Sequence, residues 1–329
     1  MTRVRVGTYK AKGGPGLAPI VRDDPGREWR VETPLAHVRN ASFAIAGSTE
    51  QFRYAVDEEA NVLIVYRGPD WEEIARIPSR GDDPCHLALF DDGRRLAGAN
   101  YASGTVAVFA IGDEGDLRAV EMSRHEGYGP NPERQDGPHA HWVGFAENGA
   151  LISVDLGADR IFAHAPGGVH TRYAAPPGSG PRHLAFHPNL PIAYLVSELA
   201  STLTVLRTEG ATWRAEAIIS TLPSGWTGES LGGAIVVDQH ASRLHVTNRG
   251  HDSVATFALD PDGAPRLLRH LPSGGASPRF VLLVGDQLLV AHEEGGGVAA
   301  FAIGDDGAPA GPPQVLDVAG AAFLMIHGD

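Results

Sequence analysis

The stretch PCHLALFDDGRRLAGANYASGTVAVFAI, residues 84–111, contains every part of the unit from which this chain is built. An apolar run (HLALF) is followed by a polar turn (DDG) and a second apolar run that ends in a polar residue (RLAGAN). A short loop (YASG) then leads into an alternating run (TVAVFAI). Short apolar runs separated by turn residues are typical of β-strands, so the stretch predicts a strand-rich repeat.

The same order of runs recurs along the whole chain. The other copies span residues 40–66, 138–164, 181–206, 232–259 and 278–303. The polar residues that end the second runs set a register: Asp57, Asn100, Asp155, Ser197, Asn248 and His292. Thr8, in VRVGTY, fits the same position. A spacing of roughly 45 residues between these positions is typical of the blades of a β-propeller.

The two ends of the chain complete a seventh repeat. The C-terminal GAAFLMIHGD (320–329) supplies the first strand that the Thr8 copy lacks. Pairing of a terminal strand into the first blade closes a ring and removes exposed sheet edges. The sequence therefore predicts an all-β, seven-bladed β-propeller, closed by pairing of its N- and C-terminal strands, as a single domain of residues 1–329. A two-domain β-sandwich protein is the alternative, and residues 122–137 and 220–230 are predicted to be long loops.

The composition excludes several classes of protein. The chain has 329 residues, a formal net charge of −13 and a pI near 5.5, so binding to nucleic acid or to an anionic membrane surface is not expected. Cys85 is the only cysteine, which excludes intramolecular disulfides. No apolar run reaches the roughly 18 residues of a membrane span. We expect a cytoplasmic protein that is a monomer or a weak homo-oligomer.

Propeller topology places function at one mouth of the central channel, where the innermost strands start and the second strands end. The innermost strands start at Asn40, Cys85, His86, His139, His141, Arg182, His183, Glu229 and Arg279. The second strands end at, or are followed by, Asn100, Tyr101, Asp155, Glu198, Asn248, Arg249 and His251. Histidine, arginine and glutamate are concentrated in these positions, and this concentration predicts a polar site at the mouth.

The residues themselves leave several chemistries open. His139 and His141 lie two apart, and alternation along a strand puts both rings on one face. The two histidines could be metal ligands, a catalytic pair or hydrogen-bonded core residues. A metal ion would need at least a third ligand from another blade, so no metal is predicted. Arg182, Arg249 and Arg279 either form ion pairs or converge on a carboxylate or phosphate.

Glu229 follows the glycine-rich loop LPSGWTGES. It is either a general base or the ion-pair partner that holds an arginine in place.

Several motifs carry a family resemblance that spans nearly the whole chain. They include GPNPERQDGPHAHWV (129–143), PPGSGPRHLAFHP (176–188), GES (228–230) and NRGHDSVATF (248–257). With these motifs the chain resembles the lactonase family of seven-bladed β-propellers, which includes bacterial 6-phosphogluconolactonases and fungal carboxy-cis,cis-muconate cyclase. The chain departs from the usual family pattern in ESLGG (229–233), SPRFV (277–281) and VAHEE (290–294), which leaves the substrate open.

The resemblance implies hydrolysis of a sugar-derived lactone, 6-phosphogluconolactonase-like, without an organic cofactor. The positions that match the family motifs are predicted to be catalytic: His141, Glu229, Arg182 and Arg249. Seven further residues are expected to bind substrate: His86, Asn100, His139, His183, Asn248, His251 and Arg279. The alternatives are a cycloisomerase acting on an anionic, muconate-type carboxylate and a non-catalytic propeller that binds a protein partner.

Overall fold

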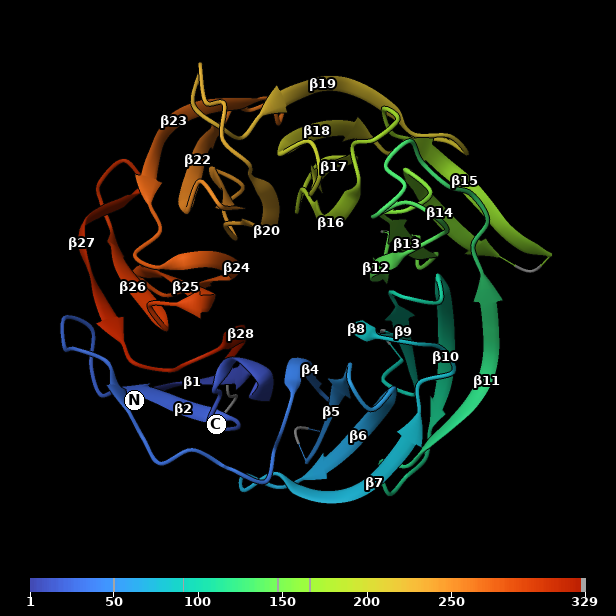
Figure 1. Cartoon of the computed structure of the whole chain (residues 1–329), viewed down its shortest axis with the longest axis horizontal. Helices are drawn as coiled ribbons and strands as arrows, with labels where there is room; N and C mark the ends of the chain where they lie inside the picture. The colour runs from blue at the N-terminus through green and yellow to red at the C-terminus, as the bar shows by residue number, and fades with distance from the viewer. Residues whose placement is uncertain (50, 91, 147, 166, 327–329) are drawn as a thin grey trace. The chain divides into compact units, whose positions relative to one another are not determined.

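The computed structural model describes residues 1–49, 51–90, 92–146, 148–165 and 167–326. Within these residues the strands form seven four-stranded sheets, and the only helix is a single 3-10 turn at Lys10–Lys12 (Figure 1). Each sheet corresponds to one repeat of the sequence. The prediction of an all-β chain built from seven strand-rich units is confirmed.

The chain divides into two compact units. Unit 1 comprises Met1–Arg39 and His183–Asp329, and unit 2 comprises Asn40–Arg182. The prediction that residues 1–329 form a single domain stays a prediction.

Unit 2 contains three sheets, and each follows the chain order of its strands. The first sheet is β4 (Ala41–Ala46), β5 (Phe52–Asp57), β6 (Val62–Arg67) and β7 (Glu72–Pro78). The second is β8 (Pro84–Leu89), β9 (Arg95–Asn100), β10 (Thr105–Ile111) and β11 (Leu117–Arg124). The third is β12 (Ala140–Phe145), β13 (Leu151–Asp155), β14 (Arg160–Ala165) and β15 (Gly168–Ala174).

The remaining four sheets include one that begins at the unit boundary: β16 (Pro181–Phe186), β17 (Ile192–Ser197), β18 (Thr202–Arg207) and β19 (Arg214–Ser220). The next is β20 (Leu231–Val237), β21 (Arg243–Arg249), β22 (Ser253–Leu259) and β23 (Pro265–Pro272). It is followed by β24 (Ala276–Val284), β25 (Gln287–Gly295), β26 (Val298–Ile303) and β27 (Pro309–Leu316). The last contains β28 (Ala321–Ile326), β1 (Thr2–Thr8), β2 (Ala18–Arg22) and β3 (Arg30–Val31).

This last sheet joins the two ends of the chain. β28 pairs antiparallel with β1, with Val6 opposite Leu324, and the blue and red strands lie side by side in Figure 1. Leu324 is 2% exposed, so the terminal strand is part of the apolar core. The predicted pairing of the N- and C-terminal strands is confirmed.

The core lies between neighbouring sheets. Second strands such as β5 are buried along their whole length, whereas fourth strands such as β19 alternate between half-buried and exposed residues. In unit 2, Tyr54 and Val65 of one sheet pack with Leu96 and Phe109 of the next. Burial of each sheet on both faces accounts for the apolar runs in the sequence.

A β-bulge recurs where the first strand of a sheet begins. Ala140 pairs with Asp155 and Trp142 with Val154, so His141 is the extra residue of the bulge. Arg279 is the extra residue between Pro278 and Phe280 in the same way. A bulge interrupts alternation and redirects the side chains around it.

Register residues of several repeats connect consecutive sheets. Asn248, at the end of β21, donates from Nδ2 to the Thr221 carbonyl at 2.9 Å and accepts from the Thr221 hydroxyl at 2.6 Å. Thr221 directly follows β19, the last strand of the preceding sheet. Asn100 makes the equivalent bond to the Ser79 carbonyl at 3.3 Å. Both asparagines are buried, so these bonds satisfy backbone groups that water does not reach.

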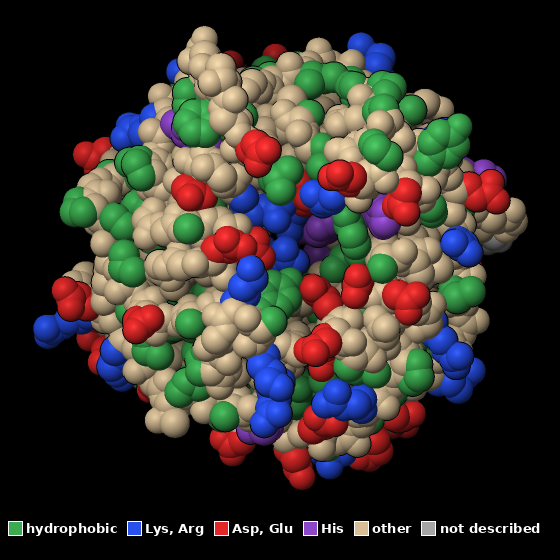
Figure 2. All heavy atoms as spheres, in the orientation of Figure 1, with side chains coloured by type: hydrophobic (Ala, Val, Ile, Leu, Met, Phe, Trp, Pro, Cys, Tyr) green, Lys and Arg blue, Asp and Glu red, His purple; other side chains and the backbone are tan. Residues whose placement is uncertain are grey.

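The surface is mixed in charge on the face drawn in Figure 2, where acidic side chains (red) are spread widely with basic ones (blue) among them. Across the residues described, no helix is long and apolar enough to cross a membrane.

We predict that Asn248→Ala lowers the free energy of unfolding by about 1–3 kcal/mol, because the buried hydroxyl and carbonyl of Thr221 lose their bonds to the Asn248 amide. Urea denaturation at pH 7 measures the change. Asn189→Ala is the matched control, since Asn189 is exposed, and it is expected to stay within about 0.5 kcal/mol of wild type. Equal stabilities of the two variants would contradict a connecting role for Asn248.

Candidate active site

Two recurring positions of the repeat hold residues of the candidate site. One is the bulge in the first strand, which holds His141 and Arg279. The other directly follows the register residue and holds Tyr9, Tyr101, Glu198, Arg249 and Glu293. We describe these residues as two groups, one in each unit.

The histidine group, in unit 2, consists of His86, Tyr101, His139, His141 and Arg182. The His139 ring stacks on Tyr101 with centroids 4.6 Å apart, and the His141 ring meets the same tyrosine edge-on at 5.5 Å. The sequence placed both imidazoles on one face by regular alternation, but β12 starts at Ala140 and bulges at His141. Both imidazole rings contact Tyr101, but regular alternation along a strand does not bring them together.

His86 is held neutral in an enclosed position. Its ring lies 4.2 Å from Phe43 and 5.6 Å from Trp142, and its Nδ1 accepts from the Val143 amide at 3.4 Å. Burial, and secondarily the charge of Arg182, lowers the pKa of His86 to about 3. A neutral imidazole next to a buried guanidinium is suited to positioning or hydrogen bonding rather than to carrying positive charge.

A buried carboxylate fixes the segment that leads into β12. Asp155 Oδ1 accepts from the His139 amide at 2.8 Å and from the Ala158 amide at 2.7 Å. Its Oδ2 lies 2.6 Å from Nδ1 of His125, which is also fully enclosed. Three buried contacts hold this carboxylate, so the backbone at His139 is rigidly placed.

The same connection extends further into the sheet. Ser153 Oγ lies 2.9 Å from His125 Nε2 and 2.8 Å from His164 Nε2, and Ser123 Oγ lies 2.9 Å from His164 Nδ1. Burial, and then the neighbouring His125, lowers the pKa of His164 to about 3. The chain of bonds leaves each of these buried polar groups with a partner.

The arginine group, in unit 1, consists of Tyr9, Glu198, Arg249, Arg279 and Glu293. Arg249 NH2 lies 2.6 Å from Glu198 Oε2, and its NH1 lies 3.6 Å from Glu293 Oε1. Arg279 NH1 lies 3.5 Å from Glu293 Oε2, and its guanidinium lies 5.2 Å from the centre of the Tyr9 ring. Arg249 and Arg279 therefore form ion pairs within the protein, and their convergence with Arg182 on an anionic ligand stays a prediction.

The other predicted residues lie as follows. Glu229 is exposed in the loop before β20, and its side chain makes no hydrogen bond or ion pair with the residues described. His183 is buried. His251 Nδ1 lies 2.7 Å from Ser253 Oγ, and its ring meets Trp226 edge-on at 4.5 Å. That these residues bind substrate stays a prediction, as it does for Asn100 and Asn248, whose amides connect sheets.

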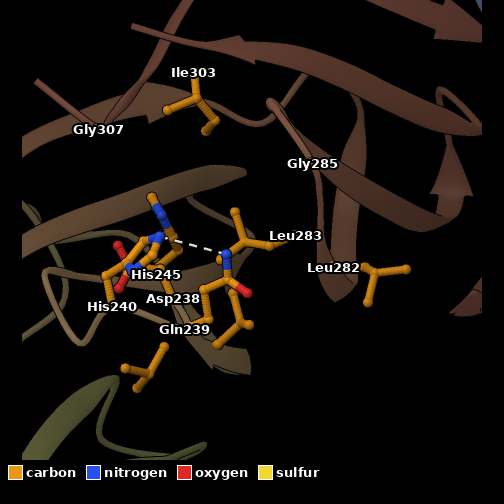
Figure 3. A pocket seen from close by; sticks show the side chains of 11 residues that line it. Asp238, Gln239, His240, His245, Leu282, Leu283, Gly285, Ile303 and Gly307 are labelled. Carbon is orange, nitrogen blue, oxygen red and sulfur yellow. Dashed lines mark hydrogen bonds between the residues drawn. The ribbon is translucent and has the colours of Figure 1, made fainter. Parts of the chain in front are cut away.

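A separate cavity of about 600 Å³ lies in unit 1 at the other end of β21 from Arg249 (Figure 3). Its wall combines Leu282 and Leu283 with Gln239 and His240, whose side chains lie 3.4 Å apart. None of the predicted site residues lines it.

No metal-binding cluster is found in the described part of the chain, where no three His, Cys, Asp or Glu side chains are grouped to hold an ion. The groups described above can supply a neutral imidazole, oriented guanidiniums and buried carboxylates.

Comparison with known proteins assigns the family. Residues 3–312 match the family described as "Lactonase, 7-bladed beta-propeller". The chain belongs to the lactonase family of seven-bladed β-propellers. Membership confirms the predicted fold class and the prediction that the protein is an enzyme, a hydrolase that opens a lactone.

Individual relatives cover almost the whole chain. The 6-phosphogluconolactonase of Bacillus subtilis is 32% identical over 314 residues, which is 90% of this chain and 89% of the relative. The solved structure of the periplasmic gluconolactonase of Pseudomonas aeruginosa is similar at a TM-score of 0.90 with 28% identity, over 99% of this chain and 98% of that one. A putative 6-phosphogluconolactonase from Bacteroides fragilis has a TM-score of 0.88 with 25% identity, over 99% and 97% of the two chains.

Sequence reasoning placed Glu198 at the mouth without giving it a role, and it did not select Glu293. Both directly follow a register residue, Ser197 and His292, just as Arg249 follows Asn248. Comparison of this one position across the repeats would have found both carboxylates together with the arginine that they contact.

We predict that the His86 ring remains neutral from pH 8 to pH 5 and that its NMR chemical shifts are flat over this range. Its folded-state pKa of about 3 lies below the ordinary value of 6.5, so the unfolded chain takes up the proton first as the pH falls. The contribution of this site to stability is therefore full above pH 6.5 and is lost toward pH 3, by up to about 1.4 kcal/mol per pH unit. A titration midpoint near pH 6 would contradict the prediction.

Proposed function

We propose that the protein hydrolyses a sugar-derived lactone and that His141, Arg182 and Arg249 are its catalytic residues. The observation that carries the proposal is the fixed orientation of the Arg249 side chain. Its side chain is 11% exposed, and its orientation is fixed by Glu198 and by a bond from NH2 to the Gly232 carbonyl at 3.3 Å. A guanidinium held in a fixed orientation is suited to a carbonyl oxygen that gains negative charge.

The reaction needs a base that deprotonates the attacking water, and it needs positive charge near the lactone carbonyl oxygen. His141 takes a proton from water while the water oxygen attacks the lactone carbonyl carbon. The carbonyl oxygen becomes an oxyanion, which Arg182 and Arg249 stabilise. When the intermediate collapses, the bond from carbon to the ring oxygen breaks and His141 returns the proton to that oxygen. The product is an open-chain hydroxy acid.

Two observations favour His141 over Glu229 as the base. His141 is 7% exposed and packs against Tyr101, so its ring is held in one orientation. Glu229 is exposed on its loop. A base contributes most when it is held at a fixed distance from the proton that it removes.

The alternatives are less well supported. A cycloisomerase acting on a muconate-type dicarboxylate would use the arginines to bind carboxylates, but Arg249 and Arg279 already contact Glu198 and Glu293. A non-catalytic scaffold would not need buried, paired charges, which are costly to maintain. We keep as expectations that the protein is cytoplasmic, is a monomer or weak homo-oligomer, and binds no nucleic acid.

We predict that His141→Ala and Arg182→Gln each lower kcat for lactone hydrolysis at least about tenfold. A pH-stat or a coloured indicator follows acid release from D-glucono-1,5-lactone and from its 6-phosphate. His240→Ala, in the separate cavity, is the control and is expected to retain wild-type rates. Wild-type rates in both site variants, with near-ultraviolet circular dichroism showing intact folds, would overturn the proposed mechanism.

A further inference from the structure

The carboxylate of Glu293 lies between the two arginines of the arginine group. Its Oε1 faces Arg249 at 3.6 Å, and its Oε2 faces Arg279 at 3.5 Å. The Glu293 and Arg279 side chains are 13% and 17% exposed, so the contact is largely shielded from water. Two guanidiniums that converge in this way form a site for an anion, and Glu293 already occupies it.

The position of Glu293 is built by neighbouring residues. Ser277 donates from its hydroxyl to Glu293 Oε1 at 2.8 Å. Ser277 has a φ of 57°, in the left-handed region, and its amide donates to Asp252 Oδ1 at 2.8 Å. A serine kept in this conformation and bonded to a carboxylate fixes where that carboxylate lies.

The charges within the group balance. Arg249 and Arg279 carry two positive charges, and Glu198 and Glu293 carry two negative ones. A phosphate dianion bound to these guanidiniums would lie against the Glu293 carboxylate and would be repelled by it. An uncharged polyhydroxy lactone meets no such repulsion, since carboxylates accept hydrogen bonds from hydroxyl groups.

We propose that Glu293 is a specificity-determining residue that excludes phosphorylated substrates and directs the enzyme to sugar lactones without a phosphate group. The inference rests on the proposed function and goes further in naming the charge of the substrate. Two of the named relatives differ in the substrate that their names give, since one is a 6-phosphogluconolactonase and the other a gluconolactonase.

The test compares two substrates and three variants. The ratio of kcat/KM for D-glucono-1,5-lactone to that for its 6-phosphate is measured for each protein. Wild type is expected to favour the unphosphorylated lactone at least tenfold. Glu293→Gln removes the charge but keeps the acceptor for Ser277, and it is expected to shift the ratio at least tenfold toward the phosphate.

Two controls separate local charge from other effects. Glu293→Asp keeps the carboxylate and is expected to keep the wild-type preference. Glu294→Gln removes a charge from the adjacent residue, which is paired with Lys12 at 2.9 Å and exposed, and it is expected to leave the ratio unchanged. A wild-type enzyme that favours the phosphorylated lactone, or a Glu293→Gln ratio equal to that of Glu294→Gln, overturns the proposal.

Binding of inorganic phosphate, measured by titration calorimetry, tests the same charge without catalysis. Glu293→Gln is expected to bind phosphate at least tenfold more tightly than wild type and Glu294→Gln do. If wild type hydrolyses neither lactone, the proposed function fails, and this binding comparison still decides the role of Glu293. Equal phosphate affinities in all three proteins would overturn it.

Discussion

Much of the structure depends on one kind of buried connection, which the register residues Asn100, Asp155 and Asn248 make to the end of the preceding sheet. Asn248 shows it most fully, because both ends of its amide bond to Thr221. Where a chain leaves one sheet for the next, its backbone polar groups are buried and must have partners. At Asn100 and Asn248 a short polar side chain in the register position supplies these partners.

The connection also explains where the site residues lie. The residue after the register position is held by the bonds that fix its neighbour, and in the repeats concerned it is Tyr101, Glu198, Arg249 or Glu293. The bulge in the first strand supplies the second position. In both places the backbone is set by the fold, so only side-chain identity has to change for function to change.

The sequence predicts the repeat, its number and the pairing of the two ends, because strand period and turn residues are local signals. It does not predict the bulge at His141, because a bulge depends on how two strands pair and not on the sequence of one. The ion pairs of Arg249 join residues of three sheets, Glu198, Arg249 and Glu293, that lie far apart in the sequence. The pattern of single strands therefore placed the arginines at the mouth but could not show that Glu198 and Glu293 are the partners of Arg249.

The balance of charge in the arginine group has a consequence for turnover. Hydrolysis of a lactone converts a neutral substrate into a carboxylate, so two uncompensated guanidiniums would hold the product more tightly than the substrate. Catalysis requires interactions that strengthen in the transition state, not in the product. Glu198 and Glu293 act as internal counter-ions to the guanidinium of Arg249, which we propose to stabilise the developing oxyanion. The arginine group presents little net charge to the acid that must leave. The same two carboxylates that allow the arginines to be buried thus favour release of the product.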